Sequence, residues 1–273
     1  MIRTSESDTR LGLAFPATVV SDRWSASSAL TIRDIDDDVL VDKQHLWGSR
    51  KPSKRALQLA FYRGLLTVSE RKGMLKTYEL MTRHFGWDRL PKAATEREIL
   101  NYLLDRALRS QGVVSLDSVC YLDPRRKPAM FRLIESRMRR KELVPVELAG
   151  AGKLQHWLRP ETLDGRVDGA EDLVHILSPF DPLINQRKRL HLLFDYEHRF
   201  EAYVPKEKRL FGYFALPVLV GNDIVALLDL KADREQQKLL LQRWTWLGKS
   251  SRRSHKKRIE DALHRFERFQ LAL

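Results

Sequence analysis

The stretch SPFDPLINQRKR, residues 178–189, holds the side chains of this sequence that are best placed to do chemistry. Pro179 and Pro182 fix their own φ angles and restrict the residues before them, so the carboxylate of Asp181 has little freedom. A carboxylate held in this way caps nearby N–H groups, the interpretation we favour, or stabilises a developing positive charge. The stretch ends with three cations that predict an anionic ligand, Arg187, Lys188 and Arg189.

Other reactive side chains do not form a metal or nucleotide motif. The histidines lack the His-Glu-x-x-His spacing of zinc sites, and Cys120 has no second cysteine to share a metal with. No glycine-rich phosphate loop is present. An acidic run could bind Mg²⁺, but a solvated loop explains it better; the run is Asp34, Asp36, Asp37 and Asp38. We therefore predict no metal site and no organic cofactor.

The composition indicates a globular protein of two or three units. The chain has 273 residues, of which 43% are hydrophobic, enough for a full core. No apolar run reaches the roughly 18 residues of a membrane span, and the N-terminal residues MIRTSESDTR are not apolar like a secretory signal. A single cysteine forms no internal disulfide, so we expect a cytoplasmic protein without membrane contact.

The charge balance favours a polyanionic partner. There are 49 Lys and Arg against 36 Asp and Glu, a net charge of +13. The excess is concentrated, because residues 49–79 carry 8 basic and 2 acidic side chains and residues 123–141 again carry 8 and 2. Two separated basic blocks indicate an internal repeat.

The first block predicts a helix followed by a hairpin. Pro52 suits a first helical turn and Gly64 a helix end. Helical spacing puts apolar side chains on one face and Lys51, Lys54 and Arg55 on the other. Residues 65–69 and 74–78 then have strand character, around a basic turn that includes Arg71 and Lys72.

The same pattern returns over Pro128–Pro160. Met130, Ile134 and Met138 form an apolar stripe, and Arg132, Ser136, Arg139 and Arg140 form a polar one opposite. Residues 143–148 and 154–158 supply a second hairpin, after a helix at about residues 96–109 and a short helix within 112–122. The repeat predicts tandem winged helices.

Winged helices of this kind favour binding to double-stranded DNA, because a helix enters the major groove and cations on helix and wing neutralise phosphates. The alternative is that each basic face is merely solvated and binds no ligand. The presence of two such helix-and-hairpin modules makes this alternative the weaker one. Phosphate contacts alone predict no preference for a base sequence. The expected DNA-binding residues are Lys51, Lys54, Arg55, Arg71, Lys72, Arg132, Arg139, Arg140, Arg187, Lys188, Arg189, Lys206, Lys208 and Arg209.

The remaining segment changes to strand periodicity. Strands are expected at residues 173–177, 200–204, 211–219, 224–230 and 238–244, which favours a small antiparallel β-barrel. Residues 255–271 return to helical spacing and are expected to pack on the sheet. We therefore predict an α+β chain of tandem winged-helix domains, a β-barrel and a C-terminal helix. Its expected division is 1–33, unassigned, 34–90 and 91–165, both winged helices, and 166–273, the barrel with its helix.

Two stretches resemble the bacterial winged-helix DNA glycosylases of the AlkZ/YcaQ type. They are KPSKRALQLAFYRGLLTVSERKGMLKTYEL, from residue 51, and LSPFDPLINQRKRLHLLFDYEHRFEAYVPKEKRLFGYFALPVLVGNDIVALLDLKADR, from residue 177, and the resemblance covers residues 34–273. It implies a monomeric DNA-repair hydrolase, associated with the nucleoid, that needs no cofactor. Such an enzyme excises alkylated bases from damaged duplex DNA and unhooks interstrand crosslinks.

The sequence differs from the family at the catalytic motif. Family members carry Gln, an apolar residue and then Gln or Asp in an N-terminal winged helix, and residues 1–50 have no such pattern, since Gln44 precedes His45 and Leu46. We leave the catalytic residues unassigned and expect an inactive or truncated form. Asp181 is the local candidate to replace the motif.

The sequence is also compatible with two other classes of function. One is a winged-helix transcriptional regulator whose barrel senses a ligand. The other is an interaction module whose cations serve solubility. Preference for one DNA sequence would favour the regulator, whereas lesion-dependent affinity without sequence preference would favour the repair protein.

Overall fold

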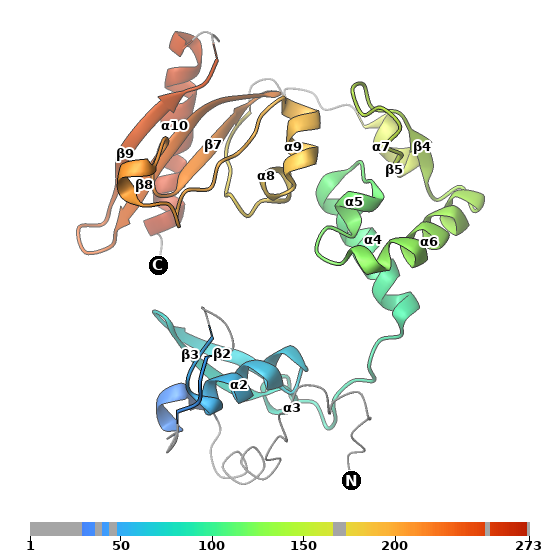
Figure 1. The fold of residues 1–273 in the computed structure, drawn as a ribbon, viewed down its shortest axis with the longest axis vertical. Coiled ribbons are helices and arrows are strands. Elements are labelled where there is room, and N and C mark those ends of the chain that lie inside the picture. Colours follow the sequence, from blue (N-terminus) through green and yellow to red (C-terminus); the bar gives the residue numbers. More distant parts are fainter. Residues whose placement is uncertain (1–28, 36–39, 44–47, 166–172, 249–251, 272–273) are drawn as a thin grey trace. The chain divides into compact units, whose positions relative to one another are not determined.

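The structure is a computed structural model that describes residues 29–35, 40–43, 48–165, 173–248 and 252–271 (Figure 1). Contacts divide the chain into two compact units, Met1–Ala93 and Ala94–Leu273. Of the acidic run considered for Mg²⁺, only Asp34 is described; the other three aspartates lie outside the described residues. The segment 1–33 is described only from residue 29 onward.

The first unit is a helix followed by a hairpin. Its elements are β1 (Leu30–Thr31), the 3₁₀ helix η2 (Ile32–Asp34), α2 (Pro52–Tyr62), β2 (Leu66–Lys72), β3 (Leu75–Leu80) and α3 (Met81–His84). The strands form an antiparallel sheet in the order β1-β3-β2. Leu57 and Ala60 of α2 pack with Leu30 and Leu66 of the strands in a small core.

Local signals explain the limits of these elements. Pro52 occupies the first turn of α2, and Gly64 follows the helix with φ at 71°, a value that glycine adopts without a Cβ clash. The strands are longer than predicted, because Lys72 pairs with Leu75. The turn is therefore centred on Gly73 and Met74, and Arg71 and Lys72 belong to β2.

The second unit begins with a helical part. Its elements are α4 (Glu96–Gln111), α5 (Leu116–Val119), the 3₁₀ helix η3 (Pro124–Arg126), α6 (Lys127–Arg139), β4 (Val144–Val146), β5 (His156–Leu158) and α7 (Pro160–Asp164). Thr95 begins α4 with a capping box, since its hydroxyl accepts from the N–H of Glu98 while the Glu98 carboxylate accepts from Thr95. Leu104, Met130 and Ile134 are fully buried in the core of this part.

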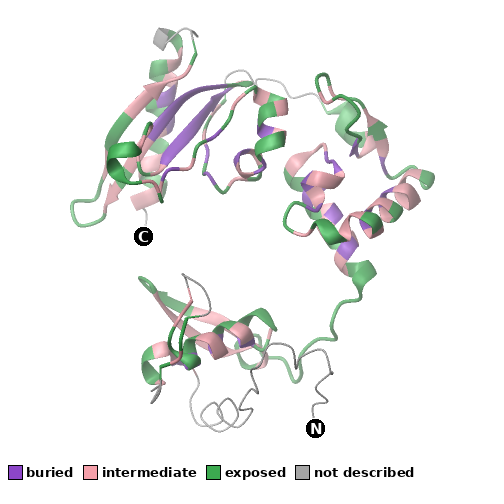
Figure 2. Ribbon diagram, viewed as in Figure 1, coloured by how far each residue is buried: buried purple, intermediate pink, exposed green. Residues whose placement is uncertain are grey.

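The second unit ends with a sheet covered by helices. Its elements are β6 (Val174–Ile176), α8 (Pro182–Asn185), α9 (Arg187–Phe194), the 3₁₀ helix η5 (Lys206–Lys208), β7 (Ala215–Val220), β8 (Asp223–Asp233), β9 (Lys238–Trp246) and α10 (Arg252–Leu271). Every residue of β7 is buried, and Figure 2 shows β7 and the first half of β8 in the buried colour. Val218 faces Ile259 of α10, whereas Leu219 packs with Ile184 of α8 and Leu190 of α9.

The predicted β-barrel is wrong. The strands pair antiparallel in the order β6-β7-β8-β9, and β6 and β9 do not pair with each other within the described residues. The sheet is open because helices occupy both faces of its centre, so burial does not require closure. The prediction that the last helix packs on the sheet is confirmed by Ile259 and Leu263 of α10.

The strand predicted at residues 200–204 is also wrong. The side chain of Glu201 is almost fully buried, and its carboxylate accepts hydrogen bonds from the N–H groups of Leu210, Phe211 and Gly212. Satisfying that buried carboxylate folds residues 201–212 into a compact loop. The apolar residues of this segment, such as Phe200, pack in an aromatic cluster with Phe180 and Phe214.

Candidate nucleic-acid interface

Two exposed cations lie at the start of α2, one at its N-cap and one in its first turn. Ser53, Leu57 and Ala60 are buried on its inner face, while Lys51 and Lys54 are exposed. Neither lysine has an ion-pair partner in the part of the chain that the structure describes. This end of the helix is therefore positively charged and open to solvent.

The tip of the β2–β3 hairpin adds two more exposed cations, Arg71 and Lys72. Nζ of Lys72 lies 3.4 Å from a carboxylate oxygen of Glu70. Both side chains are solvated, so the ion pair between them is weak. Met74 at the turn is 89% exposed. The tip thus presents cations and one apolar side chain together.

The arginines of α6 have divided roles. Met130 and Ile134 are fully buried, and Arg132 and Arg139 on the outer side are exposed with no ion-pair partner within the described segments. Arg140, just after the helix, is exposed but forms an ion pair with Glu142, with 2.5 Å between Nε and Oε1. Hydrogen bonding to Glu142 raises the pKa of the Arg140 guanidinium.

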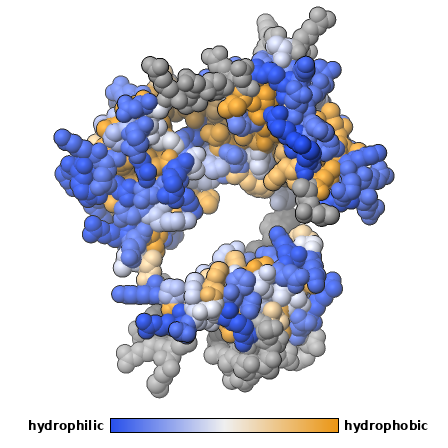
Figure 3. Space-filling view, turned by 180° about the vertical axis from the view of Figure 1, so that it is seen from behind, coloured by the Kyte–Doolittle hydropathy of each residue, from blue (hydrophilic) through white to orange (hydrophobic). Residues whose placement is uncertain are grey.

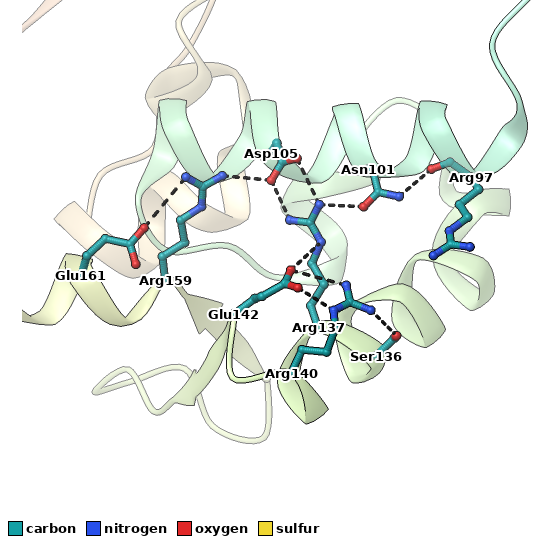
Figure 4. A network of polar contacts seen from close by, with 9 residues as sticks. All are labelled: Arg97, Asn101, Asp105, Ser136, Arg137, Arg140, Glu142, Arg159 and Glu161. Atoms are coloured by element: carbon teal, nitrogen blue, oxygen red, sulfur yellow. Dashed lines mark hydrogen bonds and ion pairs between the residues drawn. The ribbon is translucent and has the colours of Figure 1, made fainter.

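Arg137 of the same helix points into the unit (Figure 4). Its guanidinium donates to both carboxylate oxygens of Asp105 on α4, at 2.6 and 3.0 Å, and to Asn101. Arg159 also donates to Asp105, at 2.9 Å. The hydrogen bonds from Arg137, reinforced by those from Arg159, hold the pKa of the Asp105 carboxyl below its ordinary value. The sequence analysis did not predict this network. The signal that could have indicated it is Arg137 itself, an arginine on the apolar side of a basic helix.

The corner at residues 178–182 leads into α8. Asp181 is its N-cap, and Oδ1 accepts from the N–H of Leu183 at 2.8 Å, so the capping interpretation is confirmed. Of the cations that follow, Arg187 and Lys188 are exposed. Arg189 is half-buried and donates to the carbonyls of Gln111 and Val113, and burial lowers the pKa of its guanidinium.

Three of the expected DNA-binding residues lie on the 3₁₀ helix η5 or directly after it. Lys206 and Lys208 are exposed there. Arg209 is half-buried, donates through Nε to the carbonyl of Val204, and lies 4.9 Å from the ring centre of Tyr213. The two lysines are therefore free to contact solvent, whereas Arg209 stabilises the loop.

The rest of the described surface offers no metal chemistry. Within those residues no three His, Cys, Asp or Glu side chains cluster as metal ligands. Cys120 is buried, and burial raises the pKa of its thiol. Among the described helices none is long and apolar enough to cross a membrane. In Figure 3 the visible face of each unit is largely hydrophilic, and hydrophobic patches are interspersed among these hydrophilic residues.

A comparison with protein families finds a match over most of the chain. A family model described as DNA glycosylase AlkZ-like matches residues 13–269. The chain belongs to the AlkZ-like DNA glycosylase family. The AlkZ-type resemblance of the sequence is thereby confirmed.

One solved structure of an AlkZ-type protein is similar to this chain. It is the Streptomyces sahachiroi DNA glycosylase AlkZ, with 17% sequence identity and a TM-score of 0.43. The match covers 70% of this chain and 48% of the Streptomyces protein. This AlkZ-like chain therefore spans about half the length of that relative.

Proposed function

We propose that this chain is a DNA-repair protein that binds double-stranded DNA carrying alkylated bases. The observation that carries the proposal is the recurrence, within an AlkZ-like chain, of a helix with exposed cations followed by a hairpin. In this interpretation both modules, residues 34–90 and 91–165, are winged helices, and residues 166–273 form a third domain. The protein acts as a monomer.

The proposed contacts are the solvated cations. On the first module they are Lys51, Lys54, Arg71 and Lys72, and on α6 they are Arg132 and Arg139. Arg187, Lys188, Lys206 and Lys208 belong to the third domain. Arg55, Arg140, Arg189 and Arg209 are second-rank candidates, because each is half-buried or is engaged by a neighbouring group. These side chains neutralise phosphates and carry no sequence information themselves.

Binding and base excision are separate parts of the proposal. Excision of an alkylated base or unhooking of a crosslink requires a group that stabilises positive charge on the sugar and positions water. Nowhere in the 273 residues does Gln stand two positions before another Gln or an Asp. Asp181 is a poor replacement for that motif, because Oδ1 of its carboxylate is engaged in capping α8. Residues 1–273 are therefore proposed to bind DNA without releasing a base.

The test compares binding and turnover on the same substrates. We expect residues 1–273 to bind a duplex containing 7-methylguanine more tightly than the undamaged duplex, with no dependence on flanking sequence. We expect no release of 7-methylguanine and no unhooking of a nitrogen-mustard crosslink, with the Streptomyces AlkZ as positive control. Tight binding to one operator-like sequence would instead establish a regulator. Turnover by residues 1–273 would contradict the separation of binding from catalysis.

A further inference from the structure

A pocket of about 370 Å³ lies within the second unit, between its helical part and the helices that cover its sheet. Its walls come from α5 and the turn after it, the start of α6, the β4–β5 hairpin, and the α8–α9 corner. Hydrogen bonds join the walls of the helical part to the α8–α9 corner. The hydroxyl of Tyr121 donates to the carbonyl of Asn185 at 2.7 Å, and Arg189 donates to Gln111 and Val113.

One side of the pocket is cationic. Lys127, Arg187, Lys188 and Arg189 line it, against a single lining carboxylate, Asp117, which pairs with Lys127. Arg187 and Lys188 have no ion-pair partner in the described chain. They are also the first residues of α9, where the N–H groups of the opening turn lack helical acceptors. A phosphate group fits this side.

The other side of the pocket has the opposite hydrogen-bonding character. His156 is 5% exposed, and its Nδ1 must donate to the carbonyl of Leu154 at 2.9 Å. Burial and the neighbouring Arg189 lower the pKa of the ring, so at neutral pH Nε2 is an acceptor and not a cationic donor. Gln186, 7% exposed, donates to the carbonyl of Ser118 at 3.4 Å, and its Oε1 has no hydrogen-bond partner among the described residues.

The different character of the two sides favours an organic phosphate over inorganic phosphate. A bare phosphate would satisfy the cations but would fill only a small part of the pocket volume of about 370 Å³. The apolar side chains of Tyr121, Leu154 and Leu192 also need a ligand with an organic body. The volume lies in the range of small-molecule sites.

We infer that this pocket binds one nucleotide, with its phosphate on Lys127, Arg187 and Lys188 and its hydroxyl or amine donors on His156 and Gln186. The nucleotide comes either from a DNA strand or from solution. The first source rests on the proposed DNA-binding function, and the second does not.

The experiment uses the full chain and a pair of neighbouring substitutions on α9. Leu192→Trp fills the pocket and leaves every charge in place, because Leu192 lines it. Leu193→Trp adds the same ring at an adjacent position that is 39% exposed and does not line the pocket. The ligands are deoxyadenosine monophosphate, inorganic phosphate and a duplex, with affinities measured by calorimetry and folding checked by thermal melting.

We expect Leu192→Trp to weaken binding of the monophosphate or the duplex by about tenfold, while Leu193→Trp changes neither. Lys188→Gln, at an exposed position, is a second variant that keeps the fold and should weaken the same ligand. Loss confined to the monophosphate identifies a free nucleotide, and loss confined to the duplex identifies a strand nucleotide.

Two results would overturn the inference. One is equal affinity for inorganic phosphate and the monophosphate, which would reduce the pocket to an anion site. The other is no effect of Leu192→Trp on any ligand. If the wild-type chain binds the monophosphate but no duplex, the proposed DNA-binding function fails while the pocket assignment stands.

Discussion

Arg137 of α6 and Asp105 of α4 form a two-pronged ion pair, with 2.6 Å between Nη1 and Oδ1 and 3.0 Å between Nη2 and Oδ2. The arginine side chain is 11% exposed and the aspartate 28%. Their pairing fixes the basic helix α6 to α4. The pair therefore determines how the exposed arginines of α6 are presented.

Removing the carboxylate should destabilise this unit. Asp105→Asn removes the charge that Arg137 and Arg159 share and leaves the largely buried guanidinium of Arg137 with only Glu142, at 3.6 Å, so we expect a loss of about 2 kcal/mol in the free energy of unfolding. Urea denaturation followed by circular dichroism measures it. Asp164→Asn, at an exposed position, is the matched control and should leave the urea midpoint unchanged. An equal midpoint for Asp105→Asn and wild type would show that the pair contributes nothing.

The same carboxylate predicts a pH dependence. The pKa of Asp105 is lower in the folded chain than in the unfolded chain, so its contribution to stability is full above the unfolded-state value of about 4. That contribution is lost as the pH falls further, through the folded-state pKa. The stability difference between wild type and Asp105→Asn should therefore be constant near neutral pH and shrink below about pH 4. A difference as large at pH 2 as at pH 7 would contradict this assignment.

Salt should control binding to undamaged duplex. Each phosphate neutralised by a solvated cation releases a counterion, and with four or five such contacts the slope of log K against log salt is about −4. Fluorescence anisotropy with a labelled duplex at several salt concentrations measures the slope. A slope near zero would remove the electrostatic basis of the proposed interface.

Charge reversal should distinguish the arginines of α6. Arg139→Glu should weaken duplex binding roughly tenfold, because the side chain is exposed and unpaired within the described chain. Arg140→Glu should weaken it less, because Glu142 already neutralises Arg140. Lys257→Glu on α10 makes the same charge change at an exposed position outside the proposed contacts and should leave affinity unchanged. Circular dichroism checks that each variant is folded; an unfolded Arg139→Glu would mean that its side chain supports the core.

A glycine in the sheet part should resist substitution. A Cβ at Gly212, where φ is 138°, would lie 2.1 Å from Oδ2 of Asp229, whose carboxylate accepts from the N–H groups of Tyr213 and Phe214. Gly212→Ala should cost about 3 kcal/mol, measured by urea unfolding. Gly152→Ala, with φ at 59° and open space around its Cβ, separates backbone strain from this clash and should cost about 1 kcal/mol. Equal costs would show that Asp229 moves aside freely.

Local signals predicted the helices better than they predicted the sheet. Pro52 and the Thr95 capping box are contained in a few neighbouring residues, so the starts of α2 and α4 could be read from the sequence. The loop at residues 201–212 could not, because Glu201 bonds to N–H groups nine to eleven positions away. An open sheet and a closed barrel also share one alternation pattern, and only packing against α9 and α10 distinguishes them.

The same limit applies to the candidate site. Helical spacing placed Lys54 and Arg139 outside correctly, since burial on a helix follows its period. It could not separate Lys188, which is exposed, from Arg189, which turns toward the carbonyls of α4 and the turn after it. The pocket was invisible to sequence reasoning, because Lys127 and His156 meet the α8–α9 corner only through tertiary packing.

The segment between α3 and α4, residues 85–95, is exposed throughout and joins two compact units that each carry a cationic helix and hairpin. If both units bind DNA as proposed, tethering makes the second contact intramolecular once the first has formed, at an effective concentration of the order of millimolar. The overall affinity of the tethered pair for the phosphate backbone then exceeds the affinity of either unit alone by about 10²–10⁴. Under the proposed function, a duplex too short to engage both units loses that gain, so the length of the DNA, in addition to its damage, determines how long the protein stays bound.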